Sequence, residues 1–198
     1  TIAERIEPTD NGVSINLTDG KCTNPDFVVI GVGVQAASSL AEDAGIDCSN
    51  GILVDETCLT NDKNIYAAGD CVNYYFSRYG ARRRLESVQN AIDQAAIVSS
   101  SILGEPIVYS AIPWFWSDQY DLKLQIAGLS EDADLIAIRG NMDDFKFSAC
   151  HFKDNKLIAV ECVNDQKTFM LGKKLIEAQS NITPDAIENT QTNLKDWL

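Results

Sequence analysis

The sequence predicts an α/β segment followed by a small α+β domain that contains an antiparallel sheet. Residues 27–34, FVVIGVGV, form a continuous apolar run rich in β-branched side chains, which is typical of a strand buried on both faces of a parallel sheet. Apolar side chains then recur at helical spacing from Leu85 to Ile102, and Gly-Glu-Pro after them favours a helix end. Beyond Pro113 the pattern alternates, so we expect the fold to divide near residue 112.

Four further elements are expected before the long helix. Residues 13–17 alternate between apolar and polar side chains and end at a Thr-Asp-Gly turn, which indicates a half-exposed strand. Residues 38–45 predict a short helix that ends at a glycine. The apolar stretches 51–56 and 64–70 predict strands, the second of them buried. The long helix itself is expected to begin near Leu85.

The back part predicts an antiparallel sheet followed by helices. Its alternating segments are residues 120–128, 134–140 and 146–163. The last of these contains the turn signal Asp154-Asn155 and is therefore expected to form a hairpin. Residues 168–179 predict a helix, and Thr183-Pro184 starts another by the usual cap and first-turn preference.

The composition favours an acidic protein with reduced thiols. The 198 residues carry a formal charge of −13, which argues against nucleic acid or an anionic membrane as the main partner, since both attract cations. No run of about 18 apolar residues and no signal-peptide pattern is present. The six cysteines form no CxxC pair, so we expect free thiols in a cytoplasmic protein and no metal site.

Two features allow alternative interpretations. Asp70 follows Gly69 at the end of a predicted strand, where an aspartate either caps a helix or holds a ligand. Residues 113–119, PWFWSDQ, include Trp114 and Trp116, and clustered aromatic side chains form either core or the wall of a binding site. From the residues alone, capping and core packing are favoured.

Three segments together resemble a known family. They are NIYAAGDC at 64–71, RLESVQNAIDQA at 84–95 and PWFWSDQYDLKLQIAG at 113–128. The order of these segments and the residues in them resemble those of the FAD-dependent pyridine-nucleotide ferredoxin and rubredoxin reductases. The resemblance implies a Rossmann-like FAD/NAD(P)-binding segment and a reductase C-terminal domain. It also implies hydride transfer from NAD(P)H to FAD, followed by single-electron transfer to a ferredoxin or rubredoxin.

The resemblance implies roles for residues that bind FAD. Asp70 would accept a hydrogen bond from a ribityl hydroxyl, and Gly69 would let the backbone approach the cofactor. Glu86, Ser87 and Val88 would line the flavin pocket at the start of the long helix, where backbone N–H groups and the helix dipole favour negative charge.

Further roles follow from the same resemblance. Trp116 would be an aromatic wall near the isoalloxazine and nicotinamide, and Trp114 or Phe115 would be structural. Gly31 and Gly33 would let the backbone approach the nicotinamide dinucleotide, although this chain lacks the Pro-Asn pair that commonly follows these glycines.

The basic run is the expected docking point for an electron acceptor. Arg82 and Arg84, more than Arg83, would attract an acidic iron–sulfur partner. No catalytic side chain is expected, because the cofactor supplies the chemistry. His151, the single histidine, is expected to be a strand residue of the small domain.

The family pattern implies three parts: 1–40 as the end of the NAD(P)-binding domain, 41–112 as the C-terminal part of the FAD-binding domain, and 113–198 as the reductase C-terminal domain. No Gly-rich turn precedes residues 27–34, so the sequence suggests that an N-terminal half of the same enzyme is missing. The alternative is a non-catalytic fragment or relic that acts as an interaction module.

Overall fold

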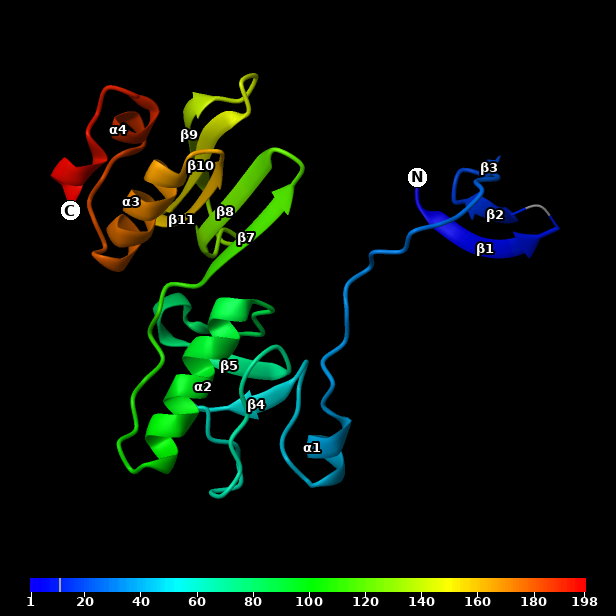
Figure 1. Ribbon diagram of the computed structural model, residues 1–198, viewed down its shortest axis with the longest axis horizontal. Coiled ribbons are helices and arrows are strands. Elements are labelled where there is room, and N and C mark those ends of the chain that lie inside the picture. The colour runs from blue at the N-terminus through cyan, green and yellow to red at the C-terminus, as the bar shows by residue number, and fades with distance from the viewer. Residues whose placement is uncertain (11) are drawn as a thin grey trace. The chain divides into compact units, whose positions relative to one another are not determined.

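The computed structural model describes residues 1–10 and 12–198, and the chain divides into two compact units, residues 1–35 and residues 36–198 (Figure 1). The first unit is a three-stranded antiparallel sheet in the order β1-β2-β3. Its strands are β1 (Ala3–Thr9), β2 (Gly12–Leu17) and β3 (Cys22–Thr23). The strand expected at 13–17 is confirmed as β2. The sequence does not predict β1, because most of its side chains are exposed and it is held by backbone pairing with β2.

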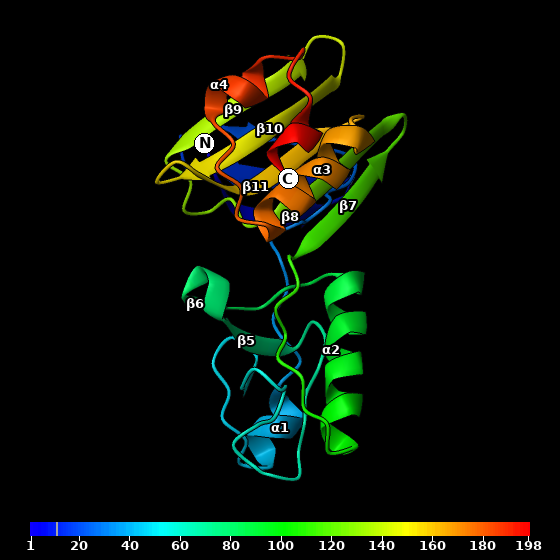
Figure 2. The same cartoon turned by 90° about the vertical axis from the view of Figure 1, so that its left-hand side faces the viewer.

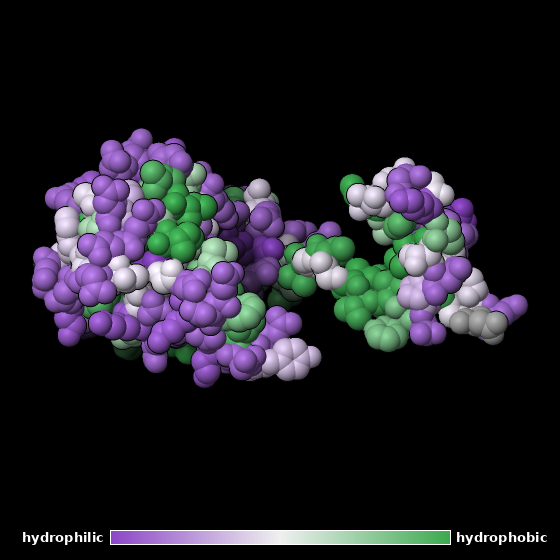
Figure 3. Space-filling model, turned by 90° about the horizontal axis from the view of Figure 1, so that it is seen from above, coloured by the Kyte–Doolittle hydropathy of each residue, from purple (hydrophilic) through white to green (hydrophobic). Residues whose placement is uncertain are grey.

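Residues 27–34 form no strand, so the prediction of a buried parallel strand there is wrong. The side chains of Phe27, Val29 and Val32 are 75, 84 and 88% exposed. Figure 3 shows apolar surface along this segment. A parallel strand needs neighbouring strands that pair with its backbone, and the sheets in the described ranges do not extend to these residues. Apolar composition alone therefore did not produce burial.

The second unit begins with an α/β arrangement that agrees with the sequence pattern. After the short helix α1 (Ser39–Asp43), β4 (Ile52–Val54) pairs in parallel with β5 (Val72–Phe76), and β5 pairs antiparallel with β6 (Ala81–Arg83). A 3-10 turn, η1 (Ser77–Tyr79), joins β5 to β6. The helix predicted at 38–45 and the strand predicted at 51–56 are confirmed.

Residues 64–70 do not form the predicted strand, which instead starts after them at Val72. Only Tyr66 makes an isolated bridge, with Leu59. The chain turns at Gly69, whose φ is +89°, and the Val72 N–H donates to the Gly69 carbonyl at 3.1 Å. The apolar run before the glycine is thus the approach to a turn.

The long helix, α2, spans Val88–Ile102 and begins three residues after Leu85. Ser87 is extended, with φ −145° and ψ 146°, and its hydroxyl accepts from the Asn90 N–H at 3.2 Å. Ser87 is therefore the N-cap. The prediction of a helix start near Leu85 overlooked this cap.

Residues 113–198 form the predicted antiparallel sheet with helices on one face (Figure 2). The strand order is β7-β8-β11-β10-β9. The strands are β7 (Trp114–Gln119), β8 (Leu122–Gly128), β9 (Leu135–Asn141), β10 (Lys146–Lys153) and β11 (Lys156–Val163). Asp154 and Asn155 form the predicted hairpin turn with φ values of 47° and 60°, as a two-residue turn between twisted strands requires.

The helical layer comprises α3 (Gln166–Glu177), α4 (Pro184–Glu188) and the 3-10 turn η2 (Leu194–Trp197). Asp165 caps α3 and Thr183 caps α4, as predicted for the Thr-Pro pair. His151 lies in β10, as expected, with its Nε2 atom 3.5 Å from Glu161 Oε1.

Two cores lie within the second unit. One is built by β4, β5 and α2 with Tyr109, and the other begins at Ile112 and continues through the five-stranded sheet and its helices. None of the helices in the described ranges has the length and apolar character needed to cross a bilayer.

Candidate functional site

The Gly69–Asp70 turn is attached to α2 by a buried hydrogen bond. The Gly69 N–H donates to Oε1 of Gln94 at 2.7 Å, and Gln94 is 1% exposed. An added Cβ at Gly69 would make only ordinary contact with Ala91, 3.8 Å away. Because the φ of Gly69 is positive, its left-handed backbone explains the glycine in this chain.

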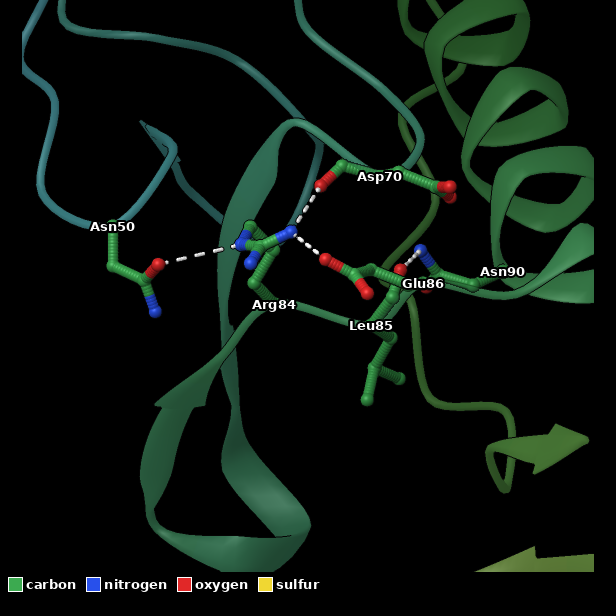
Figure 4. A network of polar contacts seen from close by, with 6 residues as sticks. All are labelled: Asn50, Asp70, Arg84, Leu85, Glu86 and Asn90. Atoms are coloured by element: carbon green, nitrogen blue, oxygen red, sulfur yellow. Dashed lines mark hydrogen bonds and ion pairs between the residues drawn. The ribbon is translucent and has the colours of Figure 1, made fainter. Parts of the chain in front are cut away.

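Asp70 does not cap a helix, so the capping interpretation is wrong. Strand β5 follows it, whereas Ser87 caps α2. Its main-chain carbonyl accepts from Arg84 Nη1 at 3.2 Å. Figure 4 shows the Asp70 carboxylate pointing away from Arg84, on the side of α2. The carboxylate is therefore presented at the surface beside the helix.

Arg84 links this turn to the residues before α2. Its side chain is 12% exposed, forms an ion pair with Glu86, and donates from Nε to Asn50 Oδ1 at 3.4 Å (Figure 4). Asn90 Nδ2 donates to the Leu85 carbonyl at 3.1 Å. These contacts position the loop that leads into the helix, where the first backbone N–H groups lack intrahelical acceptors.

The start of α2 lines a cavity of about 200 Å³ together with β7 and β8. Its lining residues are Leu85, Glu86, Ser87, Pro113, Trp114, Phe115, Ile126, Gly128 and Leu129. Val88 is not among them and is 59% exposed. The cavity therefore joins the predicted Glu86 and Ser87 to aromatic side chains of the C-terminal domain.

Trp116 lies at a different hollow from the one at the start of α2. This second hollow, of about 330 Å³, is also lined by Asp118, Lys123, Gln125, Asn164 and Gln166. The Trp116 ring centroid lies 5.5 Å from that of Trp114. Trp114 also packs against Phe169 of the C-terminal core and lies under Lys173 Nζ, which is 5.3 Å from its centroid. Trp114 therefore connects the core to the cavity at α2.

The structure separates the three arginines by their contacts. Arg82 Nη1 donates to the carbonyls of Val54 and Asn73 at 3.1 and 2.9 Å. Arg83 forms ion pairs with Glu131 and Asp132 at 3.0 and 3.9 Å. All three arginines donate to backbone carbonyls. In addition, Arg84 pairs with Glu86, and Arg83 pairs with two carboxylates from the loop after β8.

Gly31 and Gly33 lie in the first unit, within the segment that forms no strand. No atom lies within 4 Å of a Cβ built at either glycine. The φ of Gly33 is +86°, a backbone conformation that favours glycine, and the role of both glycines toward a dinucleotide stays a prediction.

Sequence reasoning did not assign Gln94 to the site, and of the residues that line the cavity it assigned Glu86 and Ser87 but not the aromatic residues Trp114 and Phe115. Gln94 stands in a helix segment whose pattern favours core packing, and nothing in the pattern marks it as the acceptor for Gly69. Trp114 and Phe115 have a usable signal, because they start the strand directly after Pro113. Among residues 1–10 and 12–198, no group of three metal-ligating side chains is found.

Comparison with known proteins finds a matching family for each of two parts of the chain. Residues 1–95 match the family described as pyridine nucleotide-disulphide oxidoreductase, and residues 114–198 match the family described as reductase C-terminal. Rhodocoxin reductase of Rhodococcus erythropolis is 40% identical over 184 residues, which cover 93% of this chain and 43% of the relative. Over most of its length the chain is thus similar to ferredoxin reductases.

Solved structures give the same result. The ferredoxin reductase of the CYP199A2 system from Rhodopseudomonas palustris superposes with a TM-score of 0.93 at 39% identity, covering 98% of this chain and 48% of that protein. Putidaredoxin reductase in its covalent complex with putidaredoxin gives 0.91 at 32% identity, with the same coverage. The chain thus spans about half the length of the relatives it matches.

Proposed function

We propose that this chain forms the flavin-facing part of an FAD-dependent NAD(P)H:ferredoxin reductase. The observation that supports this function is the continuous connection from the Gly69–Asp70 turn through Arg84 and Glu86 to the aromatic cavity at α2. When bound, FAD supplies the redox chemistry, taking up hydride from NAD(P)H and releasing single electrons. The names of the relatives, ferredoxin and putidaredoxin reductases, support the same assignment.

The residues present suit a flavin dinucleotide. The Asp70 carboxylate accepts hydrogen bonds from ribityl hydroxyls, while Gln94 and Arg84 hold the turn in place. The N-terminus of α2 provides backbone donors and a positive dipole end for negative charge on the flavin pyrimidine. Asn90 Oδ1 at this helix start is buried without a hydrogen-bond partner in the described residues, so the site retains an acceptor for a donor from outside the chain.

The aromatic side chains of β7 have a different proposed role from the residues at the start of α2. Trp114 and Phe115 line the cavity beside the start of α2 and give it an apolar wall. Trp116, 40% exposed on the same strand, is proposed as the outer aromatic wall toward the nicotinamide. Gly31 and Gly33 are proposed to contact the dinucleotide.

An acidic iron–sulfur protein, a ferredoxin or rubredoxin, is the proposed acceptor. Arg82, which donates to neutral backbone carbonyls, provides positive charge beside the flavin-facing loop in a chain of net charge −13, and this favours an acidic partner there. Arg84 is proposed as the second docking residue, with its charge partly offset by the ion pair with Glu86. The free state of all six cysteines supports a reducing compartment and hence a cytoplasmic location.

The test joins this chain to the part of rhodocoxin reductase that it does not match. The chimera is expected to retain FAD through gel filtration, and its visible flavin absorbance is expected to bleach with NADH or NADPH. A flavin-loaded chimera that neither nucleotide bleaches would contradict the reductase function. A folded chimera that stays colourless would favour the non-catalytic interaction module.

Asp70→Ala tests the residue assignment in the same chimera. Loss of one charge-assisted hydrogen bond is expected to weaken FAD binding by about tenfold. Asp43→Ala, at an exposed position at the end of α1, is the matched control and is expected to leave binding unchanged. Equal FAD affinity in both variants would remove Asp70 from the proposed site.

A further inference from the structure

Two hollows meet at Arg78, away from the flavin-facing cavity. The larger, of about 310 Å³, is lined by Arg78, Tyr79, Lys156, Leu157, Ile158, Ile176, Gln179 and Ser180. The smaller, of about 270 Å³, is lined by Phe76, Ser77, Arg78, Tyr109, Ser110, Ala111 and Gln179. They share Arg78 and Gln179 and are therefore neighbours; the larger one, the recess, is bordered by η1, the end of α3 and the start of β11.

The charge of this recess is opposite to that of the chain. Arg78 and Lys156 are the charged side chains that line it, and among the described lining residues there is no carboxylate. The chain as a whole has 29 acidic and 16 basic residues. Neither cation forms an ion pair with a carboxylate within residues 1–10 and 12–198.

The protein contacts of both cations are neutral. Arg78 Nη1 donates to the Ile176 carbonyl at 3.4 Å, a long hydrogen bond that engages one nitrogen of the guanidinium. Lys156 Nζ donates to Asn181 Oδ1. Carbonyl and amide oxygens satisfy donors but do not neutralise positive charge, so the recess favours an anion.

The floor of the recess is apolar. Leu157 and Ile158 of β11 and Ile176 of α3 line it beside the ring of Tyr79. A volume of about 300 Å³ is at the lower end of the range for small-molecule pockets, which combine apolar walls with a few placed polar groups. Inorganic phosphate would leave these apolar side chains without contact.

We propose that this recess binds a small organic acid, with its carboxylate at Arg78 and Lys156 and its apolar body over Leu157, Ile158 and Ile176. Arg78 offers the planar pair of donors that a carboxylate accepts in bidentate fashion. The site does not depend on the proposed reductase activity, because none of its residues belongs to the flavin-facing cavity.

Titration calorimetry of the purified 198-residue chain with octanoate tests the site. One octanoate is expected to bind per chain, and octanamide is expected to bind about tenfold more weakly because it lacks the charge that both cations recognise. Equal binding of octanoate and octanamide would overturn carboxylate recognition. Binding of inorganic phosphate as tight as that of octanoate would overturn the role of the apolar floor, and failure of octanoate to bind would overturn the site.

Variants locate the binding. Arg78→Gln and Lys156→Gln are each expected to weaken octanoate binding at least about fivefold, and Arg78→Lys is expected to lose less because it keeps the charge. Lys153→Gln is the matched control, since Lys153 pairs with Lys156 in the hairpin but does not line the recess. Circular dichroism confirms that each variant is folded. An equal loss in Lys153→Gln would assign the effect to diffuse surface charge and contradict the proposal.

Discussion

The helices α2 and α3 bury different kinds of side chain. α3 buries mainly apolar residues, namely Thr168, Phe169, Leu171, Gly172, Leu175 and Ile176. The longer α2 buries Asn90, Gln94 and Ile97. Its apolar residues Val88, Ile92 and Ile102 are 59, 58 and 66% exposed. Packing therefore holds α3, whereas buried amides take a large part in holding α2.

This difference follows the tasks of the two regions. The two buried amides of α2 bond the Leu85 carbonyl and the Gly69 N–H, which are backbone groups of the proposed flavin site. α3 closes the core that begins at Ile112 and continues through the five-stranded sheet. Helical periodicity predicts both helices equally well, but it does not reveal that α2 holds backbone groups of the proposed flavin site while α3 closes a core.

Alkaline pH is expected to produce the largest change in the free energy of unfolding, because thiols are buried in both cores of the second unit. Burial raises the pKa of the Cys150 and Cys162 thiols in the five-stranded sheet to about 12. It raises the pKa of the Cys58 thiol, in the core built by β4, β5 and α2, to about 11. These thiols stay neutral in the folded chain, while in the unfolded chain they ionise near pH 9.0. The free energy of unfolding is therefore highest below pH 9 and falls as the pH rises toward 12. Each thiol contributes a loss on the order of 1 kcal/mol for every unit by which burial raises its pKa.

Urea denaturation at several pH values measures this slope. Cys150→Ala is expected to reduce it, and Cys22→Ser, at an exposed thiol of the first unit, is expected to leave it unchanged. A slope that Cys150→Ala does not alter would show that burial of this thiol does not control the alkaline loss.

Gly128→Ala tests the packing of the C-terminal domain. The φ of Gly128 is +82°, and an added Cβ would lie 2.0 Å from the Ile158 carbonyl oxygen on the neighbouring strand. We expect a loss on the order of 4 kcal/mol, because the β8–β11 pairing must open. Gly104→Ala is the matched control: its φ is +83°, with no atom within 4 Å of the added Cβ. Its expected loss in chemical denaturation is about 1 kcal/mol; equal losses would refute the steric explanation.

Gln94→Leu tests the hydrogen bonding that holds α2. The Gly69 N–H would lose its buried acceptor, which costs about 1–3 kcal/mol. In the flavin-binding chimera the same change is expected to weaken FAD retention. Gln89→Leu, on the same helix and partly buried, breaks only a contact with Asp93 and is expected to change stability by less than about 0.5 kcal/mol. Indistinguishable variants would mean that the buried amide does not position the turn.

Arg83→Gln should produce the smallest change. The side chain of Arg83 is 27% exposed, and its partners Glu131 and Asp132 are 65 and 68% exposed. Surface ion pairs of this kind contribute about 0.5 kcal/mol, so thermal unfolding should shift by a few degrees at most. A larger shift would show that the ion pairs of Arg83 with Glu131 and Asp132 stabilise the protein more than surface ion pairs usually do.

Much of the fold was predictable, and the two wrongly predicted strands have a common cause. The antiparallel sheet, its hairpin at Asp154-Asn155 and the Thr183 cap depend on local signals and are confirmed. The strands predicted at 27–34 and 64–70 are wrong, since a run of apolar residues shows a tendency to be buried but not the neighbour that buries it. The Ser87 cap was visible as a serine yet was overlooked beside the helical periodicity of Leu85.

The sequence by itself determined local features, namely the turn at Asp154-Asn155, the Thr183 cap and the segments that resemble the ferredoxin reductases, because each depends on residues near one another in the chain. Only the tertiary structure decided that Gln94 holds Gly69 across 25 positions, that Arg84 joins Asp70 to Glu86, and that Phe115 shares a cavity with Ser87. It also placed Arg78 and Lys156 in one recess. Such contacts between distant residues follow from packing, which no local pattern of side chains specifies.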